Sequence, residues 1–341
     1  MPGENLTRVE AKERADNLEV ESYLVELDLT DDDKTFASKT KVIFKSKPGF
    51  STFIDAITDS VQKITLNGQE LDPAKHSDNI RIQLPNLQAQ NELVIEARGK
   101  YSNTGEGLHR FVDPVDGEAY LYTQFEVPDS RRMFPVFEQP DLKATFEFHI
   151  TAPSTWEVVS NSPTPQPTSL GGGKSIWRFA KTKRVSSYIT ALIAGPYKVW
   201  RDELTSTDGR KIPLGVFCRG SLAQFMDADY IFEKTRQGFE FYEKQFDVPY
   251  PFDKYDQLFV PEFNAGAMEN AGAVTFTETY VFRSKVADAT RERRVVTILH
   301  ELAHMWFGDL VTMRWWNDLW LNESFAEYAS TLATAEATEW H

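Results

Sequence analysis

The stretch TILHELAHMWF, residues 297–307, contains the pattern H-E-x-x-H inside an apolar run. The apolar residues around it recur at steps of three and four, as on the buried face of a helix: Val295, Leu299, Leu302 and Trp306. On such a helix His300 and His304 stand one turn apart. Two imidazoles in this relation can bind one zinc ion, and Glu301 can reach a water on that metal. The plainer alternative is a pair of helix histidines, one in the core and one at its rim.

A third metal ligand does not follow directly after this motif. A continuation as H-x-x-G-x-x-H is excluded, because Phe307 and Leu310 stand at the glycine and histidine positions. The segment NESFAEY, residues 322–328, lies in a second predicted helix that is entered through Asn317-Asp318. A turn at residues 309–316 would let the two helices pack side by side.

This packing would bring Glu323 to the metal. Two histidines and one glutamate leave the fourth position to water, which is the pattern of a catalytic zinc site. Glu327 lies one turn after Glu323, so it is either a hydrogen-bond acceptor for a ligating imidazole or a solvated carboxylate.

Three motifs in this order resemble the gluzincin zinc aminopeptidases, the aminopeptidase N family. The first is H-E-x-x-H followed, after eighteen residues, by Glu323. The second, similar to that family's exopeptidase signature, is Gly266-Ala267-Met268-Glu269-Asn270. The third, similar to a signature of its N-terminal domain, is QFE at residues 124–126 followed by RRMFP at residues 131–135. The resemblance covers nearly the whole chain.

The resemblance implies a zinc aminopeptidase with one Zn²⁺ per chain. Its metal ligands would be His300, His304 and Glu323, and Glu301 would be the general base. The zinc would act as a Lewis acid and lower the pKa of its bound water.

The resemblance also implies a substrate, namely peptides with a free N-terminus. The α-ammonium group would be bound by Glu269 within the segment Gly266, Ala267, Met268, Glu269 and Asn270. Gln124 and Glu126 are two residues apart, so on a strand they would point the same way and complete an anionic site. The small residues Gly266 and Ala267 would let the substrate backbone approach closely.

One expected part of the site does not occur in these residues. The family stabilises the oxyanion with a tyrosine hydroxyl that lies tens of residues after the third ligand, whereas Tyr328 is only five residues after Glu323. The expectation is therefore a fragment, namely the N-terminal portion of such an enzyme. Two alternatives stay open. One is the related branch of bifunctional epoxide hydrolase and aminopeptidase, which resembles G-G-M-E-N rather than the Ala267 form. The other is a non-catalytic peptide-binding fragment.

Composition limits the partners and the compartment. A formal net charge of −14, without a basic patch, argues against nucleic acid. The single Cys218 cannot form an internal disulfide, and residues 1–17 are polar without the apolar core of a signal peptide. No apolar run approaches membrane-spanning length. The sequence therefore predicts a cytoplasmic protein without a membrane partner.

The pattern along the chain predicts an α+β multidomain protein. Residues 1–196 are predicted to be a β-sandwich-like domain that helps to bind the substrate N-terminus. Residues 197–341 are predicted to be a thermolysin-like zinc peptidase domain, truncated at its C-terminus. Asn67-Gly68 predicts a hairpin turn, and residues 161–173 a surface loop. The predicted strands in the first domain include residues 19–30, 36–44, 80–84, 93–97, 144–150 and 188–194.

In the second domain the pattern predicts three helices. One is capped by Ser221 and runs to about Phe246, before Pro249. The zinc helix begins near Asp288, and the helix that carries Glu323 follows it. The tryptophan cluster around these helices is predicted to lie in the core: Trp306, Trp315, Trp316 and Trp320.

Overall fold

The computed structural model describes residues 5–340, which form two compact units. Within these residues, unit 1 comprises 5–110, 121–194 and 314–316, and unit 2 comprises 111–120, 195–313 and 317–340. Unit 1 is built mainly of strands, and unit 2 combines a five-stranded sheet with three long helices. The prediction of an α+β chain is therefore confirmed.

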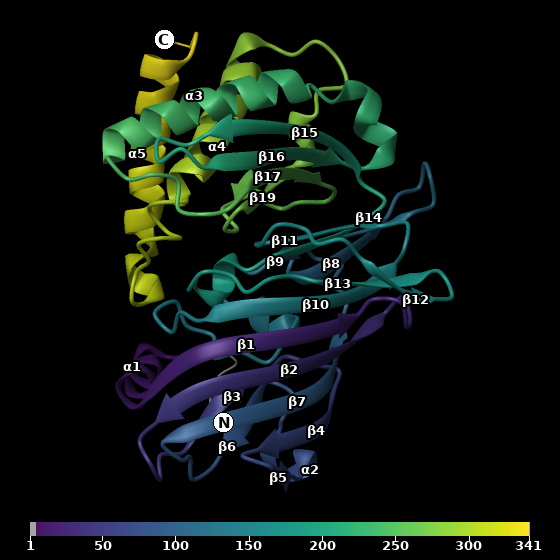
Figure 1. Ribbon diagram of the computed structural model, residues 1–341, viewed down its shortest axis with the longest axis vertical. Helices are drawn as coiled ribbons and strands as arrows, with labels where there is room; N and C mark the ends of the chain where they lie inside the picture. The colour runs from purple at the N-terminus through teal and green to yellow at the C-terminus, as the bar shows by residue number, and fades with distance from the viewer. Residues whose placement is uncertain (1–4, 341) are drawn as a thin grey trace. The chain divides into compact units, whose positions relative to one another are not determined.

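Unit 1 is organised by an eight-stranded sheet with the order β12-β13-β10-β1-β2-β7-β4-β5 (Figure 1). β1 pairs in parallel with β10, whereas the other neighbours in this sheet are antiparallel. Apolar and polar residues alternate along β1, β2, β7 and β10, so one face of the sheet is buried and the other is open to water. The strands are β1 (Leu18–Asp28), β2 (Thr35–Ser46), β4 (Ser60–Leu66), β5 (Gln69–Leu71), β7 (Gln90–Lys100), β10 (Thr145–Pro153), β12 (Thr168–Gly171) and β13 (Lys174–Arg178).

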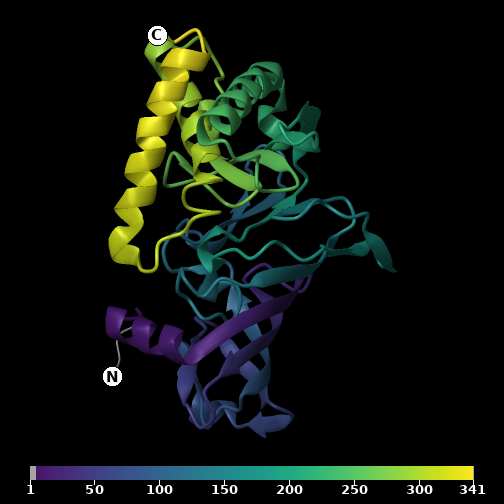
Figure 2. The same ribbon diagram turned by 60° about the vertical axis from the view of Figure 1, so that its left-hand side comes forward.

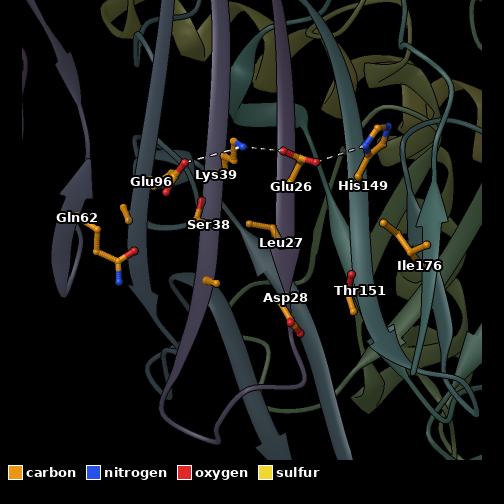
Figure 3. Close-up of a pocket in the computed structure, with 12 residues that line it drawn as sticks. Glu26, Leu27, Asp28, Ser38, Lys39, Gln62, Glu96, His149, Thr151 and Ile176 are labelled. Atoms are coloured by element: carbon orange, nitrogen blue, oxygen red, sulfur yellow. Dashed lines mark ion pairs between the residues drawn. The ribbon is translucent and has the colours of Figure 1, made fainter. Parts of the chain in front are cut away.

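Charged side chains form a row across the open face of this sheet (Figure 3). Lys39 on β2 lies between two carboxylates, 4.0 Å from Glu26 on β1 and 3.8 Å from Glu96 on β7. His149 on β10 lies 4.0 Å from Glu26 and 3.0 Å from Glu147. Glu26, Lys39 and Glu96 lie opposite one another on adjacent strands, where opposite charges are mildly stabilising.

The polar residues before β1 form a helix that the sequence pattern missed, α1 (Arg8–Asn17). Its first turn has a capping box between Thr7 and Glu10. The helix has no apolar face, and it is attached to the unit by the buried Arg14. This guanidinium donates to Asp55 Oδ2 at 2.8 Å and to Gln139 Oε1 at 2.7 Å. Two long-range ion pairs, Arg14–Asp55 and Glu10–Arg81, thus replace the apolar stripe on which recognition of a helix depends.

Arg14→Met is expected to lower the free energy of unfolding by about 3–5 kcal/mol, because it leaves Asp55 as a buried charge without its partner. Lys39→Met is the matched control, since the same change on the open sheet face should cost less than about 1 kcal/mol. Urea unfolding of both variants checks this. Equal effects would contradict the role given to Arg14.

The shorter strands form two further sheets. β3 (Thr52–Asp55) pairs with β6 (Arg81–Leu84), and a four-stranded sheet has the order β11-β14-β9-β8. A short helix, α2 (Pro73–His76), precedes β6. The four strands are β8 (Gly107–Val112), β9 (Ala119–Gln124), β11 (Glu157–Ser160) and β14 (Leu192–Gly195).

The turn predictions in this part of the chain met different outcomes. Asn67 and Gly68 have φ of 52° and 78° between β4 and β5, which confirms the predicted hairpin. The predicted strand 188–194 is wrong in its first half, because Ser187–Ile189 forms a 3-10 turn. The predicted loop 161–173 is wrong in part, because residues 168–171 form β12, which pairs back on β13.

Unit 2 contains a five-stranded sheet with the order β15-β16-β17-β19-β18. α4 packs against both of the other long helices, α3 and α5, and Figure 2 shows α5 in yellow as one continuous helix. No described helix is long and apolar enough to cross a membrane. The elements are β15 (Lys198–Thr205), β16 (Lys211–Cys218), β17 (Tyr255–Val260), β18 (Ala267–Met268), β19 (Ala273–Thr277), α3 (Ala228–Phe246), α4 (Asp288–His304) and α5 (Leu319–Ala337).

Two predictions for the helical part need correction. Ser221 does not cap α3, because residues 220–225 form a separate 3-10 helix and α3 begins at Ala228. The end of α3 at Phe246 is as predicted, and the left-handed Asp247 follows it. Trp306 is in the core, but Trp320 is 60% exposed in the first turn of α5, so the prediction of a buried tryptophan cluster is wrong there.

Candidate metal centre

The predicted metal-binding helix is α4, and its sequence explains its packing. The residues on its buried face fill the space between α4 and its neighbours, whereas its first turns are charged and exposed. Gly238 on α3 allows close approach, because a Cβ there would lie 2.5 Å from Leu299. This packing fixes the rotation of α4 and therefore the direction in which His300 and His304 point.

The structure brings the three predicted ligands together. The Nε2 atoms of His300 and His304 are 3.0 Å apart. Glu323, on the second turn of α5, places Oε2 3.3 Å from His300 Nε2 and 3.7 Å from His304 Nε2. Both helices belong to unit 2, and the turn between them makes them neighbours.

These distances fit a tetrahedral zinc ion. With bonds of 2.0–2.1 Å to nitrogen and carboxylate oxygen, tetrahedral ligand atoms lie about 3.3 Å from one another. The three separations of 3.0, 3.3 and 3.7 Å bracket this value. Two neutral imidazoles and one carboxylate are also the donor set of catalytic zinc sites. The residues present therefore fit the metal.

The other ring nitrogens orient the two imidazoles. His304 Nδ1 lies 2.9 Å from the carbonyl oxygen of Phe307, so it donates to that carbonyl and leaves the lone pair on Nε2. His300 Nδ1 lies 3.4 Å from Glu327 Oε2, which places Glu327 beside the imidazole as the helical spacing suggested. Gly308, with φ of 130°, lies against the His304 ring, where a Cβ would be 3.2 Å from Nδ1.

The electrostatics of Glu323 suit a metal ligand. Burial by itself raises its pKa, but the interactions with the rings of His300 and His304 outweigh that effect and hold the pKa well below its ordinary value. The carboxylate is therefore ionised in the presence of two nearby nitrogen atoms. Glu301, the residue after His300, is 5% exposed, so the proposed base lies in a largely water-excluded part of unit 2.

The segment with Glu269 lies next to these ligands. β18 is the edge strand of the five-stranded sheet, and Thr277 N–H donates to the Gly266 carbonyl at 2.9 Å. Glu269 follows β18 and is 3% exposed. One of its carboxylate oxygens lies within 4.8 Å of a carboxylate oxygen of Glu323. A second acidic side chain thus stands beside the proposed third ligand.

The rest of the predicted substrate segment is ordered around Glu269. Ala267 and Met268 form β18 and pair with Phe276 and Thr275 of β19. Asn270 is fully buried, and its side-chain amide donates to Thr275 Oγ1 at 3.3 Å.

The predicted pair from the first half of the chain belongs to unit 1. Gln124 is the last residue of β9, and Glu126 lies in the turn after it. The expectation that both side chains share one strand face is therefore wrong, because the strand ends before Glu126. Their proposed role in binding substrate stays a prediction.

Sequence reasoning missed the carbonyl of Phe307 as the partner of His304. A main-chain oxygen leaves no residue-type signal, so only the backbone path after α4 could show it. Gly308, which follows directly, was a signal for an unusual conformation at this position.

Comparison with known proteins gives the family. The peptidase M1 N-terminal domain matches residues 19–189, and the peptidase family M1 domain matches residues 230–341. Aminopeptidase N of Streptomyces lividans is 59% identical over 99% of this chain and 39% of its own length. Tricorn protease-interacting factor F2 of Thermoplasma acidophilum is 32% identical over 91% of this chain and 38% of its own length.

The likeness extends to animal proteins. Aminopeptidase N of Mus musculus is 34% identical over 71% of this chain and 25% of its own length. The chain thus spans about two fifths or less of the length of these relatives. Two domain types of one family match in order along the chain, and the N-terminal type alone spans residues 19–189. This chain belongs to the peptidase M1 family.

Proposed function

We propose that this chain carries the catalytic centre of a zinc-dependent aminopeptidase, which removes N-terminal residues from peptides with a free amino end. One observation carries the proposal: a carboxylate oxygen of Glu269 lies within 4.8 Å of a carboxylate oxygen of Glu323. A metal-binding triad alone fits any zinc peptidase, whereas a buried carboxylate next to it adds a binding group for one positive charge. The relatives named as aminopeptidases support the same reading.

Different residues of the chain would bind the metal and transfer the proton. His300, His304 and Glu323 would hold one Zn²⁺, which when bound supplies Lewis-acid polarisation of the scissile carbonyl and of a water molecule. Glu301 accepts a proton from the attacking water and later delivers it to the leaving amine. The fixed tautomer of His304 and the contact of His300 with Glu327 keep both imidazoles aimed at one point.

Glu269 determines where a peptide is cut. An ammonium group bound by Glu269 places the first peptide bond, rather than an internal one, beside the metal ligands. β18 is the edge strand of the five-stranded sheet, where an extended substrate would add as a further strand. Gln124 and Glu126 are proposed to add further acceptors for the same ammonium group, on the strength of the sequence resemblance.

A domain assignment and a location go with this proposal. Residues 1–196 would form the β-rich domain that helps to bind the substrate N-terminus, and residues 197–341 the thermolysin-like catalytic domain. The extents of the two family matches support this division. The cytoplasmic location stays a prediction from composition.

Metal analysis tests the centre itself. We expect the purified protein to contain about one zinc per chain and His304→Ala to lose it, because two ligands hold the ion far more weakly than three. His149→Ala is the control, since this histidine lies on the open sheet face of unit 1. Elemental analysis after dialysis gives the stoichiometry. Tight, stoichiometric zinc in His304→Ala would overturn the ligand assignment.

A further inference from the structure

A buried lysine stands beside the segment that carries Glu269. Lys254 is 3% exposed, and its Nζ donates to Asp256 Oδ2 at 2.7 Å and to the Gly272 carbonyl at 2.8 Å. A buried ammonium group is costly unless it is paired and hydrogen-bonded. Burial lowers the pKa of Lys254, and the ion pair with Asp256 opposes that effect.

The Gly272 carbonyl belongs to the turn that follows Glu269. Ala273 N–H donates to the Asn270 carbonyl at 2.9 Å, which closes a turn over residues 270–273. Gly272 has φ of 68°, the conformation that the third residue of a type II turn requires. The Gly272 carbonyl, which accepts from Lys254, also accepts a hydrogen bond from the Asp256 N–H at 3.1 Å. The side chain of Lys254 and the backbone N–H of Asp256 therefore both hold the Gly272 carbonyl.

Glu269 lies between two fixed points. On its amino side, β18 pairs with β19 through Met268 and Thr275. On its carboxyl side, only Asn270 and Ala271 separate Glu269 from Gly272, whose carbonyl accepts from Lys254. A shift at Gly272 must therefore pass along a short, buried segment to the carboxylate of Glu269.

We propose that Lys254 is a positioning residue for substrate recognition, which acts through the Gly272 carbonyl to hold Glu269 in place for the substrate ammonium group. This inference rests on the proposed function of Glu269. Asp256 serves as the counter-charge and is itself held by Arg201, whose Nη1 lies 2.9 Å from Asp256 Oδ1. The chain of contacts runs from Arg201 through Asp256 and Lys254 to the turn after Glu269.

Lys254→Met tests this role, because it keeps the length of the side chain and removes its donors and charge. We expect zinc content to stay at the wild-type level, while kcat/KM on a dipeptide with a free amino end falls by about 10²-fold. The preference for free over acetylated peptide should fall with it. Lys254→Arg, which keeps the charge and the donors, should recover most of the loss. Lys211→Met is the matched control, because it makes the same change at an exposed lysine on β16, the strand next to β17.

Hydrogen exchange gives a readout that does not depend on activity. Amides of residues 269–273 should exchange about tenfold faster or more in Lys254→Met than in wild type, with α4 unchanged. If Lys254→Met fails to fold, Asp256→Asn gives the same test through the weakened counter-charge. Wild-type exchange together with wild-type kcat/KM in either folded variant overturns the proposal. A wild-type protein that shows no preference for free amino ends would instead refute the proposed function, and the exchange data would still decide whether Lys254 anchors the turn.

Discussion

Glu301→Gln is expected to lower kcat by about 10²–10⁴, the usual contribution of a general acid–base group, while zinc content stays at the wild-type level. Gln has nearly the same shape as Glu, so the packing of α4 should survive the change. It cannot accept the proton of the attacking water, and it cannot later deliver a proton to the leaving amine. The loss should therefore appear in kcat more than in KM.

The control for this variant lies on the same helix. Glu292→Gln changes an exposed carboxylate of α4 and should leave kcat within the error of measurement. Steady-state rates on one peptide and zinc analysis of all three proteins complete the comparison. A near-normal kcat in Glu301→Gln would remove Glu301 from the mechanism, and a loss of zinc would mean that it acts on the metal ligands instead.

N-acetylation of a peptide substrate is expected to reduce its hydrolysis by wild-type protein by about 10²–10⁴. Hydrogen bonds to charged groups contribute about 1.5–3 kcal/mol each, and acetylation removes two or more of them together with the positive charge. Glu269 would then be buried without its cation. The added acetyl group would also occupy the space in which the chain has to end.

Glu269→Ala should reduce the difference between the rates of hydrolysis of the free and the acetylated peptide. The variant is expected to raise KM for the free peptide and to lower kcat, because a misplaced amine also misplaces the scissile carbonyl. The rate of hydrolysis of the acetylated peptide should be nearly the same in Glu269→Ala as in wild type. Glu240→Ala, an exposed carboxylate on α3, is the control. Equal wild-type rates on the free and acetylated peptides would contradict recognition of the ammonium group and favour an endopeptidase.

The arrangement of the candidate metal ligands could be predicted because it depends on local spacing. Positions four apart on a helix share a face whatever surrounds the helix, so His300 and His304 had to meet once α4 formed. Predicting the position of Glu323 required one further assumption, namely that the turn between α4 and α5 is short enough to make the two helices neighbours. The structure places its carboxylate 3.3 Å from His300 by that route.

The features that sequence reasoning missed depend on long-range contacts. α1 was not recognised because two ion pairs with residues far along the chain, Arg14–Asp55 and Glu10–Arg81, replace an apolar face. Lys254 carries no motif, and its role follows from a backbone carbonyl eighteen residues away. Glu126 was placed on a strand by extrapolation of a period of two, but β9 ends at Gln124. None of these has a periodic signature in the residues nearby.

The most direct test of the account is the order in which products appear from one peptide of about ten residues with a free amino end. Mass spectrometry should show residues leaving one at a time from the amino end. A chelator should stop the release, and stoichiometric zinc should restore it. Internal fragments as the first products would contradict assignment as an aminopeptidase, and release that continues without metal would contradict the zinc centre at His300, His304 and Glu323.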